Sequence, residues 1–231
     1  MSRKKIVYLQ NIEQKESYTT AKQAAFYAVA GGHALLLIGS PGSGKTMIAE
    51  RISTIFPDIT YQEQIEITEI YSAAGKLQSN SLMLQRPFEN PHHSISLAGL
   101  VGGGSIPVPG SITLAHKGVL FLDELLEFKK SCIESLRQPL EAKKITITRA
   151  HGQCTFPAEC LLVAATNPCP CGYYGDKRHT CSCSPHAIKK YLQKLSGPLL
   201  DRIDLHVGVC PHAHVCHDYI GDEKWSSKTM K

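Results

Sequence analysis

The residues best suited to chemistry form one short glycine-rich segment near the start of the chain. Its members match the phosphate-loop pattern at every required position, and they are Gly39, Ser40, Pro41, Gly42, Ser43, Gly44, Lys45 and Thr46. Glycines let successive backbone N–H groups turn towards phosphate oxygens, and a helix N-terminus adds positive potential. We therefore expect Lys45 to contact the β- and γ-phosphates of ATP and the Thr46 hydroxyl to complete a Mg²⁺ site.

Two further polar groups stand at the ends of apolar runs. Asp123 and Glu124 follow the run 118–122, and Asn167 follows the run 160–165. We expect Asp123 to hold Mg²⁺ through water, Glu124 to act as the base that activates water, and Asn167 to orient that water and sense the γ-phosphate. The alternatives are an acidic helix cap for the pair and a simple Asn-Pro turn for Asn167. The phosphate loop upstream favours the catalytic interpretation.

Close pairs of cysteines suggest a second kind of site. The chain has nine cysteines and no export signal, so its thiols are expected to be reduced and suited to metal or redox chemistry. The pairs that stand closest flank a polar loop and are Cys169, Cys171, Cys181 and Cys183. Four thiolates suit tetrahedral Zn²⁺, although C-x-C is tighter than the usual zinc spacing and His179 could replace one ligand. Zinc binding and unligated loop cysteines both stay open.

The elements that must position these groups alternate between helices and short apolar strands. We expect helices near 20–30, 47–55 and 63–74, and an amphipathic helix from the acidic pair to about 141. Strands are expected at 34–38, 118–122 and 160–165, and a β-hairpin at 144–150 and 153–156, whereas 86–110 is loop-like. The carboxyl ends of parallel strands meet at one crevice, so the acidic pair can lie beside the phosphate loop.

Length and composition set the outer limits. A chain of 231 residues, 42% hydrophobic and 19% charged, holds one good-sized α/β domain, or a domain and part of a second. It contains neither an apolar run of about 20 residues nor a secretion signal, so we expect no membrane partner and a cytoplasmic location. The net charge of +5 permits a nucleic-acid partner without demonstrating one.

Several longer segments, taken together and in order, resemble one family. They are GSPGSGKT, RPFENPHH, LVGGGSIPVPGSITLAHKGVLFLDEL, LRQPLE, TRAHGQCTFPAECLLVAATNPCPCG and LSGPLLDRIDLHV, spread over about 12–209. They look like the magnesium-chelatase-like AAA+ ATPases of the ComM/YifB type. The resemblance implies an α/β P-loop NTPase (AAA+) core with a parallel doubly wound sheet and a β-hairpin before the sensor strand. It also implies homo-oligomeric rings, hexamers in this family, with ATP between subunits.

The resemblance also assigns roles that spacing alone does not. Arg202, in LLDRIDL, matches the arginine finger that reaches a neighbouring subunit's site, and an ordinary ion pair at a helix end is the alternative. The hairpin matches one that faces the pore in ring motors. Lys143, Lys144 and Arg149 thereby become candidates for contacting DNA phosphates, with a solvated hairpin edge as an equal alternative.

Relatives of this type are implied to be DNA helicases of branch migration in natural transformation, whereas magnesium-chelatase I subunits drive metal insertion into a porphyrin. Cys-Pro-Cys-Gly after Asn167-Pro168, in place of acidic residues, favours the DNA motor over the chelatase motor. The family usually adds a Lon-protease-like domain before the core and a helical lid after it. We expect a lead-in at 1–19, a core without its lid at 20–209 and a divergent or truncated tail at 210–231. Ring formation then depends on a supplied lid, and a nucleotide-binding remnant without turnover is a further alternative.

Overall fold

The computed structural model describes residues 14–77, 81–104, 107–149, 152–176 and 178–209. The proposed tail at 210–231, the first part of the lead-in, and Ala150 and His151 of the expected hairpin lie outside these residues. None of the helices within the described ranges has the length and apolar character needed to span a membrane.

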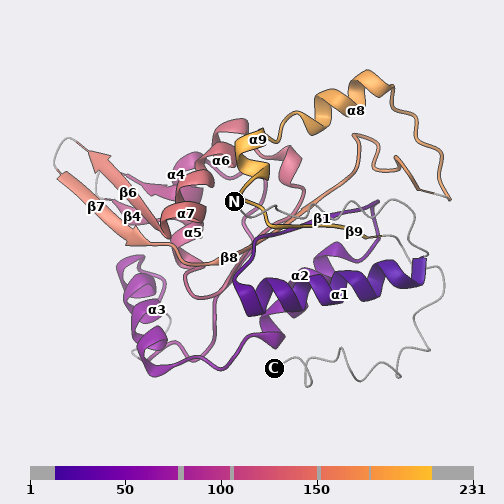
Figure 1. Ribbon diagram of the computed structural model, residues 1–231. Helices are drawn as coiled ribbons and strands as arrows, with labels where there is room; N and C mark the ends of the chain where they lie inside the picture. The colour runs from indigo at the N-terminus through magenta and orange to yellow at the C-terminus, as the bar shows by residue number, and fades with distance from the viewer. Residues whose placement is uncertain (1–13, 78–80, 105–106, 150–151, 177, 210–231) are drawn as a thin grey trace, which may run out of the picture.

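A five-stranded, fully parallel sheet forms the centre of the fold (Figure 1). Across the sheet the strands run in the order β2 (Phe88–Glu89), β5 (Val119–Leu122), β8 (Leu161–Thr166), β1 (Leu35–Ile38) and β9 (Leu205–Gly208). The central strands β1, β5 and β8 are apolar runs with almost no exposed residue, as expected of parallel strands that are covered on both faces.

Alternate residues of each strand enter two separate cores, one on each face of the sheet. Leu35 and Leu37 pack with α1 (Gln14–Gly31) and α2 (Lys45–Ile52), whereas Leu36 points into the opposite core. That opposite core receives side chains from α4 (Leu97–Val101), α5 (Ser111–Leu114), η2 (Leu125–Glu127), α6 (Lys130–Ser135), α8 (Pro185–Leu192) and α9 (Gly197–Leu200). Helices on both faces confirm the expected doubly wound sheet (Figure 1).

The strand order places the site-bearing strand ends side by side. β1 lies between β8 and β9, and β5 lies on the far side of β8. The phosphate loop leaves β1, the acidic pair leaves β5 and Asn167 leaves β8. Because all these strands are parallel, the three segments emerge at the same edge of the sheet.

Three parts of the chain differ from the elements expected from sequence. Helix α1 begins at Gln14, so the end of the expected lead-in is helical. The stretch at 86–110 contains β2, α4 and a two-stranded sheet of β3 (Gly102–Gly103) and β4 (Val108–Pro109). The continuous helix expected after the acidic pair is wrong, because η2, α6 and α7 (Arg137–Ala142) replace it. The break falls at Phe128 and Lys129, whose ψ angles of 150° and 139° are extended and separate η2 from α6.

The expected β-hairpin is confirmed, and it projects from one end of the molecule (Figure 1). Strands β6 (Lys144–Arg149) and β7 (Gly152–Pro157) pair in antiparallel register, with Thr146 opposite Thr155. Ile145 and Ile147 are buried in the core that also holds α4 and α5. The hairpin is therefore fastened to the domain through one apolar face.

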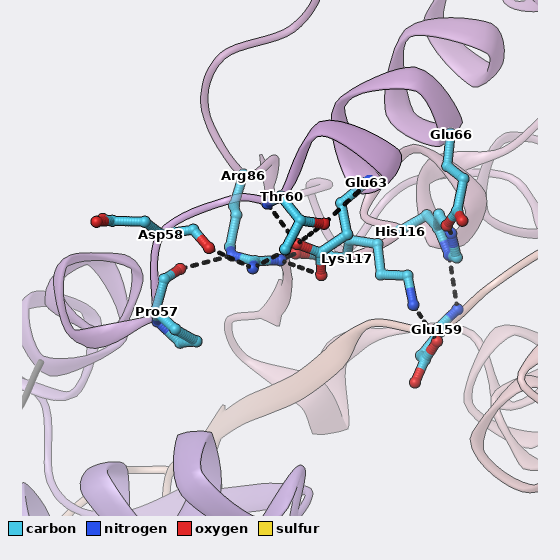
Figure 2. A network of polar contacts seen from close by, with 9 residues as sticks. All are labelled: Pro57, Asp58, Thr60, Glu63, Glu66, Arg86, His116, Lys117 and Glu159. Carbon is cyan, nitrogen blue, oxygen red and sulfur yellow. Dashed lines mark hydrogen bonds and ion pairs between the residues drawn. The ribbon is translucent and has the colours of Figure 1, made fainter.

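Helix α3 (Tyr61–Ala73), which follows the short η1 (Ser53–Ile55), is held at its N-terminus by a half-buried arginine, Arg86 (Figure 2). Thr60 and Glu63 form a capping box, and Arg86 Nη1 and Nη2 bind the two oxygens of Glu63 at 3.0 and 2.9 Å. Arg86 also donates to the carbonyl oxygens of Pro57 at 3.1 Å and Lys117 at 2.8 Å. One guanidinium thus joins three separate segments.

The same network continues through a buried histidine (Figure 2). His116 Nδ1 accepts the backbone N–H of Glu159 at 3.1 Å, and its Nε2 lies 3.2 Å from Glu66 Oε2. Acceptance at Nδ1 requires the proton to sit on Nε2, which then donates to Glu66. Burial lowers the pKa of His116, in keeping with a neutral ring. Arg86 and His116 therefore join α3 to the segments that carry Lys117 and Glu159.

Candidate nucleotide-binding site

The phosphate loop joins the end of β1 to the start of α2 through glycines that no other residue could replace at low cost. Gly42 and Gly44 have φ angles of 73° and 86°, the left-handed region that glycine enters without strain. A Cβ atom on Gly39 would lie 2.2 Å from the carbonyl oxygen of Val209, just beyond β9. The loop conformation therefore depends on these glycines and on close packing against the neighbouring strand.

Lys45 begins α2 and is buried within the loop that precedes it. Its Nζ donates to the carbonyl oxygens of Gly39 at 2.7 Å and Ser40 at 3.0 Å, and lies 3.4 Å from Asn167 Oδ1. Burial lowers the pKa of Lys45, and the negative charges of Asp123 and Glu124 offset part of that effect. The ammonium group is thus held inside the loop, with Asn167 beside it.

Asp123 contacts the phosphate loop directly. The Thr46 hydroxyl donates to Asp123 Oδ2 at 2.9 Å, although the two residues are 77 positions apart in sequence. The other carboxylate oxygen, Oδ1, accepts the backbone N–H of Glu124 at 2.9 Å. A hydroxyl and a carboxylate are hard oxygen ligands of the kind that Mg²⁺ takes in nucleotide sites, so this pair fits the expected metal.

Glu124 is held by a partner whose role the sequence did not indicate. His93 Nδ1 lies 3.3 Å from Glu124 Oε2, and the side chains are 35% and 53% exposed. The centroid of the His93 ring lies 4.0 Å from the centroid of the His92 ring and 6.5 Å from that of the buried Phe128 ring. The segment RPFENPHH carried the only signal for this histidine, and nothing in that pattern indicated its partner.

Two groups of predicted residues lie elsewhere in the structure. Arg202, which follows α9, forms an ion pair with Glu141 and donates to the carbonyl oxygen of Pro198. This is the contact expected of an ordinary ion pair, and the role of Arg202 at a neighbouring subunit stays a prediction. Lys143 and Lys144 are exposed at the base of the hairpin, and Arg149 ends β6, its side chain lying outside the described structure.

The four cysteines singled out in the sequence meet at one point. Their Sγ atoms lie within 4.8 Å of one another, in the turns between β8 and α8. His179, which the sequence offered as an alternative to one cysteine, is not part of this group, and its Nδ1 lies 3.7 Å from Asp176 Oδ1. Sequence spacing had left the arrangement of these thiols undecided, whereas the fold brings all four together.

These features define the class of the protein. A parallel doubly wound sheet, a phosphate loop after β1 and an acidic pair after β5 make the chain an AAA+ P-loop NTPase core. The structure is similar to that of NtrX from Brucella abortus in complex with ADP, with a TM-score of 0.52 and 14% identity, covering 87% of this chain and 37% of that one. At that identity the likeness concerns the fold.

The family follows from the sequence comparison. Residues 9–215 match the model described as "Magnesium chelatase, subunit ChlI", and the chain belongs to that family. It is 48% identical over 184 residues to YifB of Escherichia coli (strain K12), which covers 80% of this chain and 36% of YifB. It is 50% identical over 190 residues to competence protein ComM of Haemophilus influenzae, which covers 82% of this chain and 37% of ComM.

A more distant relative is an MCM-type protein, MJ0961, of Methanocaldococcus jannaschii, at 26% identity over 171 residues, covering 74% of this chain and 19% of that protein. The chain thus spans little more than a third of the length of YifB and ComM. These matches confirm the resemblance drawn from the motifs.

Proposed function

We propose that this chain binds ATP with Mg²⁺ and hydrolyses it within a ring, as the motor core of a protein that acts on DNA. The contact between Thr46 and Asp123, at 2.9 Å, carries the nucleotide part of this proposal. It joins the phosphate loop to the strand-end carboxylate, so the phosphate cradle and the ligands for the metal lie side by side. Membership of the magnesium-chelatase family supports the same conclusion.

Each residue of the site has a distinct task in hydrolysis. The backbone amides of the loop and Lys45 bind the triphosphate, while Thr46 and Asp123 would hold the Mg²⁺ that neutralises its charge. Glu124 takes the proton from the attacking water, and Asn167, next to Lys45, orients that water. Arg202 of one subunit would leave Glu141 and stabilise the transferring phosphoryl group of the next.

A magnesium-dependence measurement tests the nucleotide site. Mg²⁺ should raise the affinity of the parent chain for ATP. Asp123→Asn should show no such increase, while its affinity for ATP without Mg²⁺ should equal that of the parent. Asp58→Asn is a matched control, because Asp58 is exposed and precedes α3, outside the phosphate loop and the acidic pair. If Mg²⁺ improved ATP binding equally in the parent and in Asp123→Asn, the assignment of the metal ligand would be wrong.

The proposed action on DNA rests on the hairpin and on two relatives. ComM is a competence protein and MJ0961 is an MCM-type protein. Lys143 and Lys144 present adjacent exposed cations at the hairpin base, a fitting place for backbone phosphates.

DNA binding should weaken with salt, and Lys143→Ala/Lys144→Ala should make the slope of log K against log salt shallower by about 0.9 for each phosphate that is no longer neutralised. Lys189→Ala/Lys190→Ala, an exposed pair on α8, is the control and should keep the parent slope. Absence of DNA binding at low salt, together with association with a porphyrin-binding protein, would replace the DNA motor by a chelatase motor.

A further inference from the structure

Four cysteine thiols converge beside the phosphate loop, from two turns that are separate in sequence. Cys169 and Cys171 follow β8, and Cys181 and Cys183 precede α8. All four Sγ atoms lie within 4.8 Å of one another, with Cys169 fully buried and the other three half-buried. Burial of apolar area is a weak reason for half-buried thiols to gather, whereas a shared metal ion accounts for all four.

The distances between the sulfurs distinguish the possible occupants. The Cys169 Sγ lies 3.3 Å from that of Cys171 and 3.7 Å from that of Cys181, and the last two are 3.6 Å apart. A disulfide needs about 2.05 Å, so these thiols are not bonded to each other. Zn–S bonds of about 2.3 Å give a tetrahedron with edges of about 3.8 Å, close to the observed separations. A polynuclear iron–sulfur cluster would hold its ligand sulfurs farther apart, because the cluster itself lies between them.

Three of these sulfurs each accept a hydrogen bond from a backbone N–H, as metal-bound thiolates do. The N–H of Tyr174 donates to Cys169 Sγ at 3.3 Å, and the N–H of Cys171 donates to Cys183 Sγ at 3.4 Å. The N–H of Cys183 donates to Cys181 Sγ, also at 3.4 Å. Hydrogen bonds of this kind stabilise negative sulfur and orient the ligands of a metal.

The cysteine turns also contact the nucleotide site. Gly172, in the turn with Cys169 and Cys171, has a φ angle of 87°, and a Cβ atom there would lie 2.7 Å from the side chain of Pro41 in the phosphate loop. Asn167, whose Oδ1 lies 3.4 Å from Lys45 Nζ, stands two positions before Cys169. The turn is therefore packed against the loop and continuous with the residue proposed to orient water.

We propose that Cys169, Cys171, Cys181 and Cys183 bind one Zn²⁺ ion, and that this ion supports the phosphate loop by holding the Gly172 turn against Pro41. Each thiol gives up its proton to solvent on binding, so four thiolates and one Zn²⁺ form a tetrahedral centre with no change in oxidation state. The support of the loop rests on the proposed nucleotide site, whereas binding of the ion does not.

Metal content measured by mass spectrometry tests the site itself. The purified chain should carry one zinc per molecule, and Cys181→Ser/Cys183→Ser should carry none. Two controls should keep their zinc: Cys154→Ser, on β7 outside the cluster, and Cys210→Ser/Cys216→Ser, outside the described residues. Three results would overturn the site. The reduced protein could bind no zinc after zinc is added, it could bind iron in place of zinc, or the tail variant alone could lose its zinc.

Nucleotide affinity tests the support of the loop. If the loop without zinc holds its binding conformation only about a tenth of the time, the apparent Kd of a fluorescent ADP analogue rises about tenfold in Cys181→Ser/Cys183→Ser. Gly172→Ala keeps every ligand but forces the turn away from Pro41, so it should keep zinc and still weaken nucleotide binding. An unchanged Kd in both variants would overturn the support of the loop.

Lys45→Met separates the two proposals, because it should keep zinc while it loses affinity for nucleotide. A parent chain that binds zinc but no nucleotide would refute the proposed function and leave the metal site standing. The opposite result, nucleotide binding without zinc, would refute the metal site alone.

Discussion

Replacing Lys45 by methionine is the most direct test of the phosphate loop. Methionine keeps the length and the apolar stem of the side chain but removes the ammonium group that donates to the carbonyl oxygens of Gly39 and Ser40 at 2.7 and 3.0 Å. In the parent chain those bonds must be exchanged for bonds to phosphate oxygens when nucleotide binds. The binding free energy lost on substitution is therefore the difference between the bonds to phosphate and the bonds to the loop carbonyls.

That difference sets the expected size of the effect. Two hydrogen bonds from a charged donor contribute roughly 3–6 kcal/mol together. Breaking the two bonds to the loop carbonyls offsets about half of this, which leaves about 1.5–3 kcal/mol, or roughly a 10- to 200-fold rise in Kd. Lys45 is only 8% exposed, so water has little access to replace the hydrogen bonds that the substitution removes.

The assay is the anisotropy of a fluorescent ADP analogue titrated with each variant in the presence of Mg²⁺. Lys130→Met is the matched control, because Lys130 is exposed at the start of α6, and its affinity should equal that of the parent. Thermal unfolding should show that both variants are folded. A folded Lys45→Met variant whose Kd rises less than about threefold would refute the assignment of the loop lysine.

Three further outcomes are expected. Glu124→Gln should keep nucleotide affinity and slow phosphate release by about 10²- to 10⁴-fold, and unchanged release would remove Glu124 from the role of base. His93→Ala should free the Glu124 carboxylate and raise the rate of single-turnover hydrolysis by up to about fivefold. The limit follows because this exposed pair contributes at most about 1 kcal/mol. Slower hydrolysis would show that His93 assists Glu124 in the reaction. Arg86→Met should lower the free energy of unfolding by roughly 1.5–3 kcal/mol in denaturant titrations, because the charge-assisted hydrogen bonds from Arg86 to half-buried Glu63 are lost. Burial raises the pKa of Glu63, but hydrogen bonds from Arg86 and Thr60 outweigh it and lower that pKa from 4.5 to about 2. Glu63 therefore stabilises the folded chain above pH 4.5 and loses that contribution as the pH falls to about 2, a dependence that Arg86→Met should flatten.

Sequence patterns were sufficient for the parts of the site that depend on local structure. A strand, a glycine turn and a helix in direct succession indicate a phosphate loop, because backbone conformation there follows from residue type. The same holds for the apolar run before Asp123 and for the alternation at 144–157, which predicted β5 and the hairpin β6–β7. The continuous helix expected after Glu124 failed because the backbone is extended at Phe128 and Lys129, and the hydrophobic period through these residues carries no sign of that break.

Motif order also indicated the family, and the comparisons confirmed it. The partners of individual side chains could not be predicted in the same way. RPFENPHH could be recognised as a motif, yet the pairing of His93 with Glu124 and of Arg86 with Glu63 could not be deduced from it. Each of these pairs joins residues on segments whose relative position depends on irregular connections.

The sequence by itself therefore determined the class of protein, the phosphate loop and the strands after which the polar groups stand. Only the tertiary structure decided that Thr46 lies against Asp123, that Arg202 pairs with Glu141 and that four thiols meet beside Pro41. The physical reason is that periodicity and turn chemistry act between near neighbours in the chain. Contacts between distant residues depend on how whole elements pack, and a displacement of about one ångström is enough to make or break a hydrogen bond.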